Sequence, residues 1–87
     1  MDMSPAAKIQ AEVLTLLHRV SRHPINPTPT SALVDDLGFD SLQVLEVVEE
    51  LEEKFDISIP LNDVPSIRTV AQVVERVMSL VGEKARA

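Results

Sequence analysis

The chain has 87 residues, which is enough for one domain with a small hydrophobic core and too few for two. It contains no cysteine, and this excludes a disulfide framework, a thiolate metal site and a cysteine nucleophile together. The formal net charge is -6, a sign that disfavours nucleic acid and anionic membranes as partners and favours basic proteins.

The amino terminus lacks a basic region followed by an apolar run, and no segment approaches the roughly 20 apolar residues that span a bilayer. We therefore expect a cytoplasmic protein without membrane insertion. Only two residues are aromatic, so the core must be built from aliphatic side chains.

The first predicted helix begins at Ser4 and Pro5, a capping hydroxyl followed by a residue whose missing N–H costs nothing in the first turn. Apolar residues then recur at helical spacing until about Arg22. Three prolines in the segment 23–30 withhold donors and restrict the residues before them, so this segment should be an ordered or semi-extended loop.

The second predicted helix begins after Asp40, and Gln43 stands at the spacing of a capping box. Apolar residues in this helix recur at steps of three and four, and glutamates occupy the flanks and the opposite face. The apolar positions are Leu42, Leu45, Val48, Leu51 and Phe55. We expect their side to pack and the other side to be strongly acidic.

A short helix is expected between Pro60 and Pro65, where there is room for at most one turn. The last long helix begins after Thr69, where Gln72 repeats the capping spacing, and should stop at Gly82. No segment alternates apolar and polar residues as a convincing strand would. The sequence therefore predicts an all-α fold, a four-helix bundle of three long helices and one short helix.

The segment D-D-L-G-F-D-S-L, residues 35–42, is the candidate functional site because it places Ser41 in the first turn of the second helix. A hydroxyl there is exposed and held in place. If it were esterified to phosphate, the anion would lie against free helix amides, a contact worth about 0.3–1 kcal/mol. On spacing alone, a passive serine in an ordinary capped helix start fits equally well.

The run L-G-F-D-S-L, followed by an acidic amphipathic helix, by E-E-K-F-D-I-S-I-P and by I-R-T-V, resembles the acyl carrier protein family over nearly the whole chain. The resemblance implies a single acyl carrier domain over residues 1–87, of the freestanding type, acting as a monomer. It implies that a phosphopantetheinyl transferase moves a phosphopantetheine arm from coenzyme A to Ser41, with a magnesium ion belonging to that reaction. Asp40 then precedes the modified serine, and Leu42 supports it.

By the same resemblance, Glu46, Glu49 and Glu53 belong to a docking face for acyl synthases and transferases with basic patches. The arm ends in a thiol, so a chain without cysteine can carry cargo as a thioester in fatty acid, lipid or polyketide biosynthesis. The protein is then not an enzyme and has no catalytic residue, because it only presents a tethered substrate at high effective concentration.

Residues 61–68 depart from the family pattern, since they hold one carboxylate, a proline and a base where familiar fatty acid carriers are more acidic. Gln43 is likewise neutral at a position that is commonly acidic. A specialised carrier for an unusual acyl chain therefore fits as well as a general fatty acid carrier. Two other classes stay open: a peptidyl or aminoacyl carrier of a nonribosomal pathway, which would usually have a less acidic second helix, and an unmodified acidic helical interaction module.

We expect apolar cargo to be partly sheltered between helices two and three, among Leu45, Val48, Ile59 and Ile67, because burying each methylene gains about 0.8 kcal/mol.

No metal site is expected, since the carboxylates before Ser41 lack the ladder of a calcium loop. His18 and His23 lie near the end of the first helix, where they should interact with the helix dipole.

Overall fold

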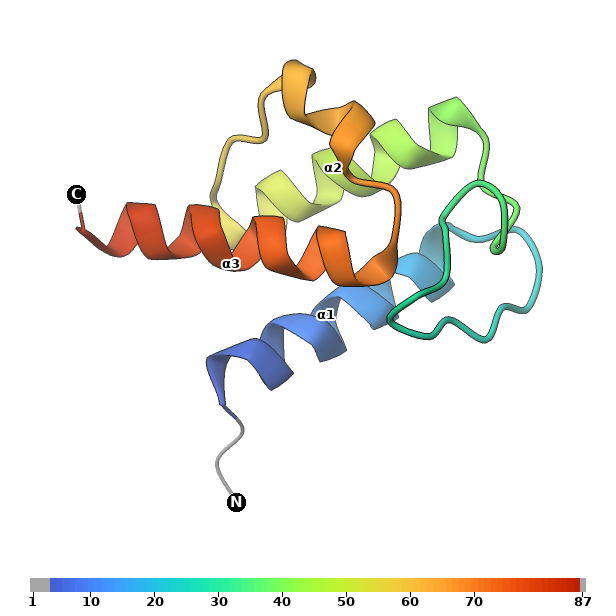
Figure 1. The fold of residues 1–87 in the computed structure, drawn as a ribbon, viewed down its shortest axis with the longest axis horizontal. Coiled ribbons are helices and arrows are strands. Elements are labelled where there is room, and N and C mark those ends of the chain that lie inside the picture. The colour runs from blue at the N-terminus through green and yellow to red at the C-terminus, as the bar shows by residue number, and fades with distance from the viewer. Residues whose placement is uncertain (1–3, 87) are drawn as a thin grey trace.

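The computed structural model describes residues 4–86 and contains three long helices and one short 3₁₀ helix (Figure 1). The helices are α1 (Pro5–Val20), α2 (Ser41–Phe55), η1 (Leu61–Ser66) and α3 (Val70–Arg86). Within the described residues there is no strand, only an isolated bridge between Ala32 and Thr69. The predicted all-α architecture is confirmed.

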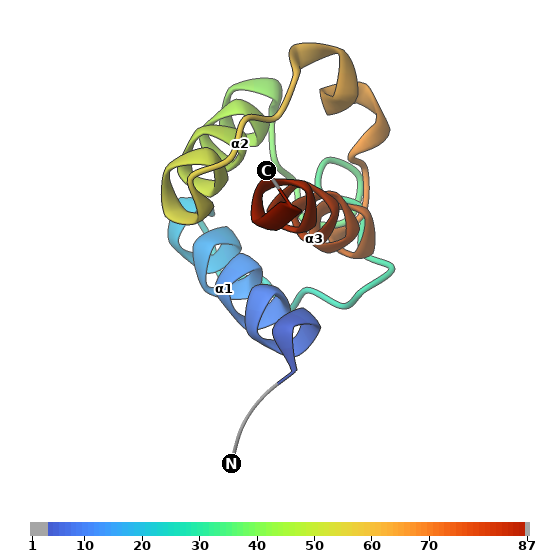
Figure 2. The same ribbon diagram turned by 90° about the vertical axis from the view of Figure 1, so that its left-hand side faces the viewer.

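The three long helices surround one interior, and η1 lies to one side of it, near α2 and α3 (Figure 2). Both α2 and α3 pack more extensively against α1 than against each other. Buried apolar residues from the three long helices, from the loop between α1 and α2 and from the two segments that flank η1 form a single cluster. Its one aromatic member is Phe39, and all the others are aliphatic.

The helix α1 forms as its sequence predicts. The Ser4 hydroxyl accepts a hydrogen bond from the Ala7 N–H at 3.2 Å, and Pro5 is the first helical residue. The helix ends at Val20, where the Ser21 N–H still donates to the Leu17 carbonyl. None of the helices within residues 4–86 combines the length and the apolar composition needed to span a bilayer.

The loop between α1 and α2 is ordered, because backbone hydrogen bonds join it to the start of α3. The carbonyls of Pro29 and Ser31 accept from the Ala71 and Val70 N–H groups at 2.9 and 3.0 Å. The Leu33 N–H donates to the Arg68 carbonyl at 2.8 Å. The first two bonds satisfy amides at the start of α3 that have no partner inside the helix. The proline-rich segment is therefore a fixed support for the residues that lead into α2.

The packed face of α2 differs from the predicted one. Leu42 is 60% exposed and Leu45 is 40% exposed, whereas Val47 is buried. The full buried set of this helix is Gln43, Val47, Val48 and Leu51. Because α1 and α3 cover the face centred on these positions, the start of the predicted apolar stripe is turned outwards.

The predicted helix stop at Gly82 is wrong, because α3 continues through it to Arg86. Glycine inside a helix costs only about 1 kcal/mol relative to alanine, too little to end a helix by itself. The short helix is also longer than predicted, since η1 includes Pro65. The fixed φ of proline lies within the 3₁₀ range, so Pro65 fits without breaking the turn.

Candidate functional site

Ser41 is the first residue of α2, and its side chain is exposed. The Asp40 carboxylate accepts from the Gln43 N–H at 2.8 Å, and the Gln43 Oε1 accepts from the Asp40 N–H at 3.1 Å. The predicted capping box is thus confirmed. The Ser41 hydroxyl has no hydrogen-bond partner among residues 4–86, so the fold does not need it for capping.

Two backbone amides beside this hydroxyl are free to bind an anion. The Val44 N–H donates to the Asp40 carbonyl, and the Gln43 N–H donates to the Asp40 carboxylate. The preceding N–H groups, those of Ser41 and Leu42, have no acceptor in the described part of the chain. Free amides at the positive end of a helix dipole favour a phosphate there. A phosphodiester on Ser41 therefore fits the local structure.

Gly38 directs the chain into the start of α2. Its φ is +74°, in the left-handed region that favours glycine. A Cβ at this position would lie 3.4 Å from the His23 Cε1. His23 was expected near the end of α1, but it lies beyond that helix, with its ring beside Gly38. Leu37 and Phe39, on either side of the glycine, are buried and anchor the turn in the core.

Gln43 has a second role that the sequence did not reveal. Its side chain is only 5% exposed, and Nε2 donates to the Val20 carbonyl at 3.3 Å. The amide orientation is fixed, because the Asp40 N–H can only donate and must face the oxygen. Gln43 therefore ties the start of α2 to the end of α1, which a carboxylate at this position could not do.

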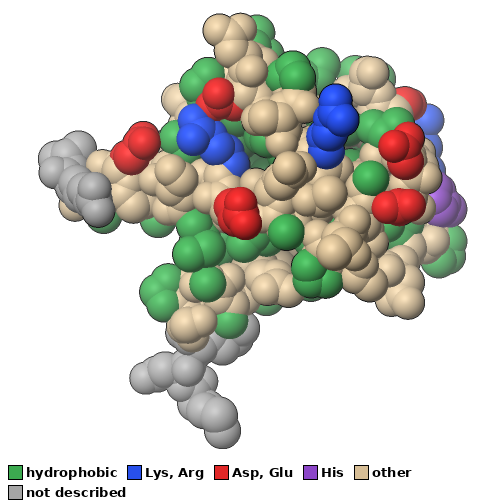
Figure 3. Space-filling view, viewed as in Figure 1, with side chains coloured by type: hydrophobic (Ala, Val, Ile, Leu, Met, Phe, Trp, Pro, Cys, Tyr) green, Lys and Arg blue, Asp and Glu red, His purple; other side chains and the backbone are tan. Residues whose placement is uncertain are grey.

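The structure divides the glutamates of α2 into two groups. Glu46, Glu49 and Glu53 are exposed and belong to none of the four ion pairs within residues 4–86. By contrast, Glu50 pairs with Arg19, and the Glu52 carboxylate accepts from the Ile59 N–H at 2.8 Å. The three residues predicted as a docking face are thus the ones whose charges the fold leaves free. On the face that carries η1 and α3, acidic and basic side chains are scattered (Figure 3).

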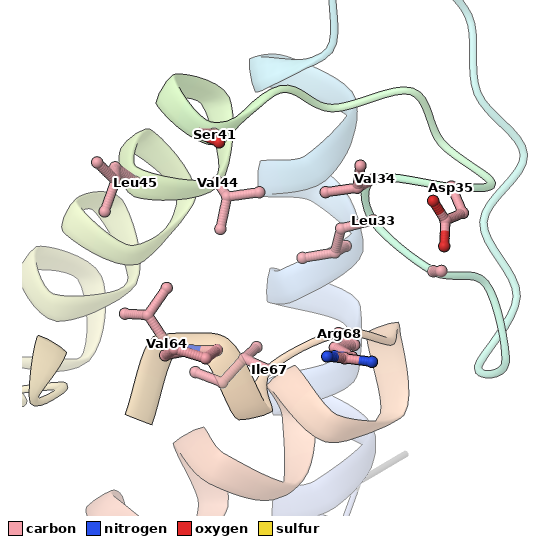
Figure 4. Close-up of a pocket in the computed structure, with 11 residues that line it drawn as sticks. Leu33, Val34, Asp35, Ser41, Val44, Leu45, Val64, Ile67 and Arg68 are labelled. Carbon is pink, nitrogen blue, oxygen red and sulfur yellow. The ribbon is translucent and has the colours of Figure 1, made fainter. Parts of the chain in front are cut away.

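A pocket of about 580 Å³ opens beside Ser41, between α2, η1 and the preceding loop (Figure 4). It is lined by residues 32–35 of the loop, by Ser41, Val44 and Leu45 of α2, and by Val64, Pro65, Ile67 and Arg68. Of the residues predicted to shelter cargo, Leu45 and Ile67 line this pocket. Val48 and Ile59 do not line it, although they belong to the same buried core as Ile67.

Two of the carboxylates before Ser41 have structural roles. Asp36 accepts from the Ala32 N–H at 2.7 Å, and Asp40 caps α2. Within residues 4–86, no three histidine or acidic side chains are grouped closely enough to hold a metal ion.

Residues 8–77 match the family model described as the phosphopantetheine attachment site. The acyl carrier protein of Amoebophilus asiaticus is 37% identical over 75 residues, which cover 86% of this chain and 94% of that protein. The acyl carrier protein of Syntrophobacter fumaroxidans is 54% identical over 48 residues, 55% of this chain and 59% of the relative. A non-reducing polyketide synthase of Preussia isomera is 35% identical over 79 residues, which span 91% of this chain but 3% of the synthase.

A solved structure from Mycobacterium tuberculosis, described as an acyl carrier protein, superposes with a TM-score of 0.77. It is 37% identical to this chain, and the match covers 82% of this chain and 96% of that one. The family match and the relatives indicate a carrier of covalently attached phosphopantetheine. The chain belongs to the acyl carrier protein family.

Proposed function

We propose that this protein holds acyl intermediates as thioesters on a phosphopantetheine arm attached to Ser41. The observation that carries the proposal is the exposed, unbonded Ser41 hydroxyl beside two free amides at the start of α2. In the modification, the Ser41 oxygen forms the new phosphodiester and loses its proton, and the nucleotide part of coenzyme A leaves. Asp40 caps the turn that begins at Ser41, and Leu42, which is 60% exposed, would support the arm from the same turn.

Intact mass is the direct test of attachment. We expect the wild type to gain one phosphopantetheine group when it is incubated with coenzyme A and a promiscuous phosphopantetheinyl transferase. Ser41→Ala should fold and stay unmodified, whereas Ser58→Ala, at another exposed serine, should be modified normally. If the mass of the wild type never increases, an unmodified acidic interaction module becomes the better interpretation of the function. A gain by Ser41→Ala would move the attachment site elsewhere.

An acyl carrier is favoured over a peptidyl or aminoacyl carrier. The acidic second helix supports this choice, and so do relatives that are named as acyl carrier proteins and a polyketide synthase. The cargo would belong to fatty acid, lipid or polyketide biosynthesis. The carrier would work as a monomer in the cytoplasm. Sedimentation tests the oligomeric state, and cell fractionation tests the location.

Glu46, Glu49 and Glu53 would form the docking face for the transferase and for acyl synthases with basic patches. Each exposed pair should contribute about 0.2–1 kcal/mol, so the effect should be distributed and sensitive to salt. The variant Glu46→Lys with Glu53→Lys should slow transferase turnover at low ionic strength. The control is Glu75→Lys with Glu83→Lys, which changes the net charge equally on α3. Equal slowing by the two variants would show that only net charge matters.

The pocket beside Ser41 would shelter apolar cargo. Val44, Leu45, Val64 and Ile67 supply aliphatic walls, and each methylene buried there gains about 0.8 kcal/mol. A long acyl chain should therefore raise the melting temperature and slow amide exchange relative to the free-thiol form. If neither quantity changes, the chain stays in solvent or on a partner.

A further inference from the structure

The pocket beside Ser41 is apolar at one end and charged at the other. Val44 and Leu45 of α2 lie across the pocket from Val64 of η1, whereas Asp35 and Arg68 both lie on the side away from Leu45, without contacting each other (Figure 4). A shelter for a saturated chain needs only the apolar end. The charged end therefore requires a separate explanation.

Neither charged side chain is used by the fold. Four ion pairs form among residues 4–86, and neither Asp35 nor Arg68 belongs to one. Asp36, next in sequence, accepts from the Ala32 N–H, but no hydrogen bond of the described residues involves the Asp35 side chain. The guanidinium has five N–H donors, and an ionised carboxylate only accepts, so the pocket end offers both kinds of hydrogen bond.

The backbone that carries these two side chains is fixed. The Arg68 N–H donates to the Gln72 side chain at 2.9 Å, and the Arg68 carbonyl accepts from the Leu33 N–H at 2.8 Å. The second bond also joins the α1–α2 loop, which holds Asp35, to the segment between η1 and α3, which holds Arg68. In contrast, η1 on the other side contributes no buried residue. The polar groups thus stand on the rigid wall of the pocket, which is the arrangement that gives a site its specificity.

We propose that this pocket selects acyl chains that carry keto and hydroxyl oxygens, with Arg68 donating to carbonyl oxygens and Asp35 accepting from hydroxyl groups. The inference rests on the proposed carrier function and specifies its cargo. Ligand pockets of about 300–1,000 Å³ are mostly apolar, and a few placed polar groups set their specificity. A saturated chain makes no use of either charge.

The expected effect of Arg68 is modest, because the residue is exposed. One hydrogen bond of typical net strength corresponds to about a fivefold change in an equilibrium constant. We therefore expect the ratio of pocket-bound to free chain to fall about twofold to fivefold when Arg68 loses its charge.

The test compares two chains of equal length on the arm of the intact carrier. One is saturated octanoyl, the other carries one ketone and one hydroxyl oxygen, and both are amide-linked so that they do not hydrolyse. Amide chemical shifts of Val44, Val64 and Ile67 report entry of either chain. The Arg68 side-chain N–H signal reports direct contact. The variants are Arg68→Gln and Asp35→Asn, with Arg22→Gln as a control at an exposed arginine outside the pocket.

We expect the oxygenated chain to shift the Arg68 side-chain signal in the wild type, and the saturated chain to leave it unchanged. Arg68→Gln should reduce entry of the oxygenated chain alone, and Arg22→Gln should reduce neither. The inference is overturned if both chains enter equally and Arg68→Gln affects them alike, or if the oxygenated chain stays outside the wild-type pocket. A protein that takes up no arm at all would instead overturn the carrier function, which the mass measurement detects separately.

Discussion

The substitution Gln43→Glu separates the two hydrogen bonds that the buried Gln43 side chain makes. A carboxylate can still accept from the Asp40 N–H, as Gln43 Oε1 does at 3.1 Å. It cannot donate to the Val20 carbonyl, as Nε2 does at 3.3 Å. The variant thus keeps the cap of α2 and removes its tie to α1.

The expected loss of stability is the difference between two opposing effects. Leaving a buried acceptor unsatisfied costs about 1–3 kcal/mol, and Gln43 is only 5% exposed. A new negative charge near the start of a helix returns about 0.3–1 kcal/mol at an exposed site, but the cost of burying this carboxylate beside Asp40 offsets that gain. The free energy of unfolding should therefore fall by about 1–3 kcal/mol, and each kcal/mol should lower the melting temperature by about 4–8 °C.

The chain supplies a matched control in Gln72→Glu. Gln72 holds the same third position of α3, and its Oε1 accepts from the N–H groups of Arg68 and Thr69. It is exposed, and its amide nitrogen donates to no residue of the described chain. Urea unfolding followed by circular dichroism should show Gln72→Glu to be neutral or slightly stabilising. If the two substitutions change the stability equally, the bond to Val20 contributes nothing and the reasoning is refuted.

Three further outcomes can be measured by unfolding and titration. Gly82→Ala should stabilise the protein by about 0.5–1 kcal/mol, because Gly82 lies inside α3 and a Cβ there meets no atom within 4 Å; a loss of stability would contradict the helical assignment. Gly38→Ala should destabilise by about 1–2 kcal/mol, because φ is +74°, and an unchanged stability would argue against the left-handed turn. A hydrogen bond from Lys84 and its charge hold the pKa of Asp56 below its ordinary 3.8, so Lys84→Met should raise that pKa in an NMR titration. Because the pKa of Asp56 is lowered in the folded state, its ionised form stabilises the fold above pH 3.8. The difference in stability between wild type and Lys84→Met should therefore vanish as the pH falls through the lowered pKa. A difference that persists in strong acid would have another origin.

Local features of the fold could be predicted from the sequence, and features that depend on packing could not. The capping boxes at Asp40 and Thr69 are set by residues three apart, so spacing alone finds them. The exposure of Leu42 could not be predicted, because periodicity does not say which side of an apolar stripe the neighbouring helices cover. The end of α3 was missed at Gly82 because one glycine seldom outweighs a helix that is favourable on both sides of it.

The candidate site shows the same division. The motif around Ser41 placed the serine at the start of α2, and the structure adds that its hydroxyl is free. Sequence could not show that the charge of Glu50 is paired, because its partner, Arg19, lies far away along the chain. The bond from Gln43 to Val20 and the position of Arg68 in the pocket likewise depend on contacts between distant segments.

The hydrogen bonds between the α1–α2 loop and the start of α3 have a consequence for local unfolding. They join the loop and the beginning of α3 into one cooperative unit, which should open only near the global free energy of unfolding. The 3₁₀ helix η1 has no buried residue. Within residues 4–86, the only ion pair between η1 and α3 is that of Asp63 with Arg76. Local opening of η1 should therefore cost much less free energy. The loop that leads to Ser41 and the outer wall of the pocket thus belong to units of different stability. Fluctuations that let a chain enter or leave should therefore leave the geometry at Ser41 undisturbed.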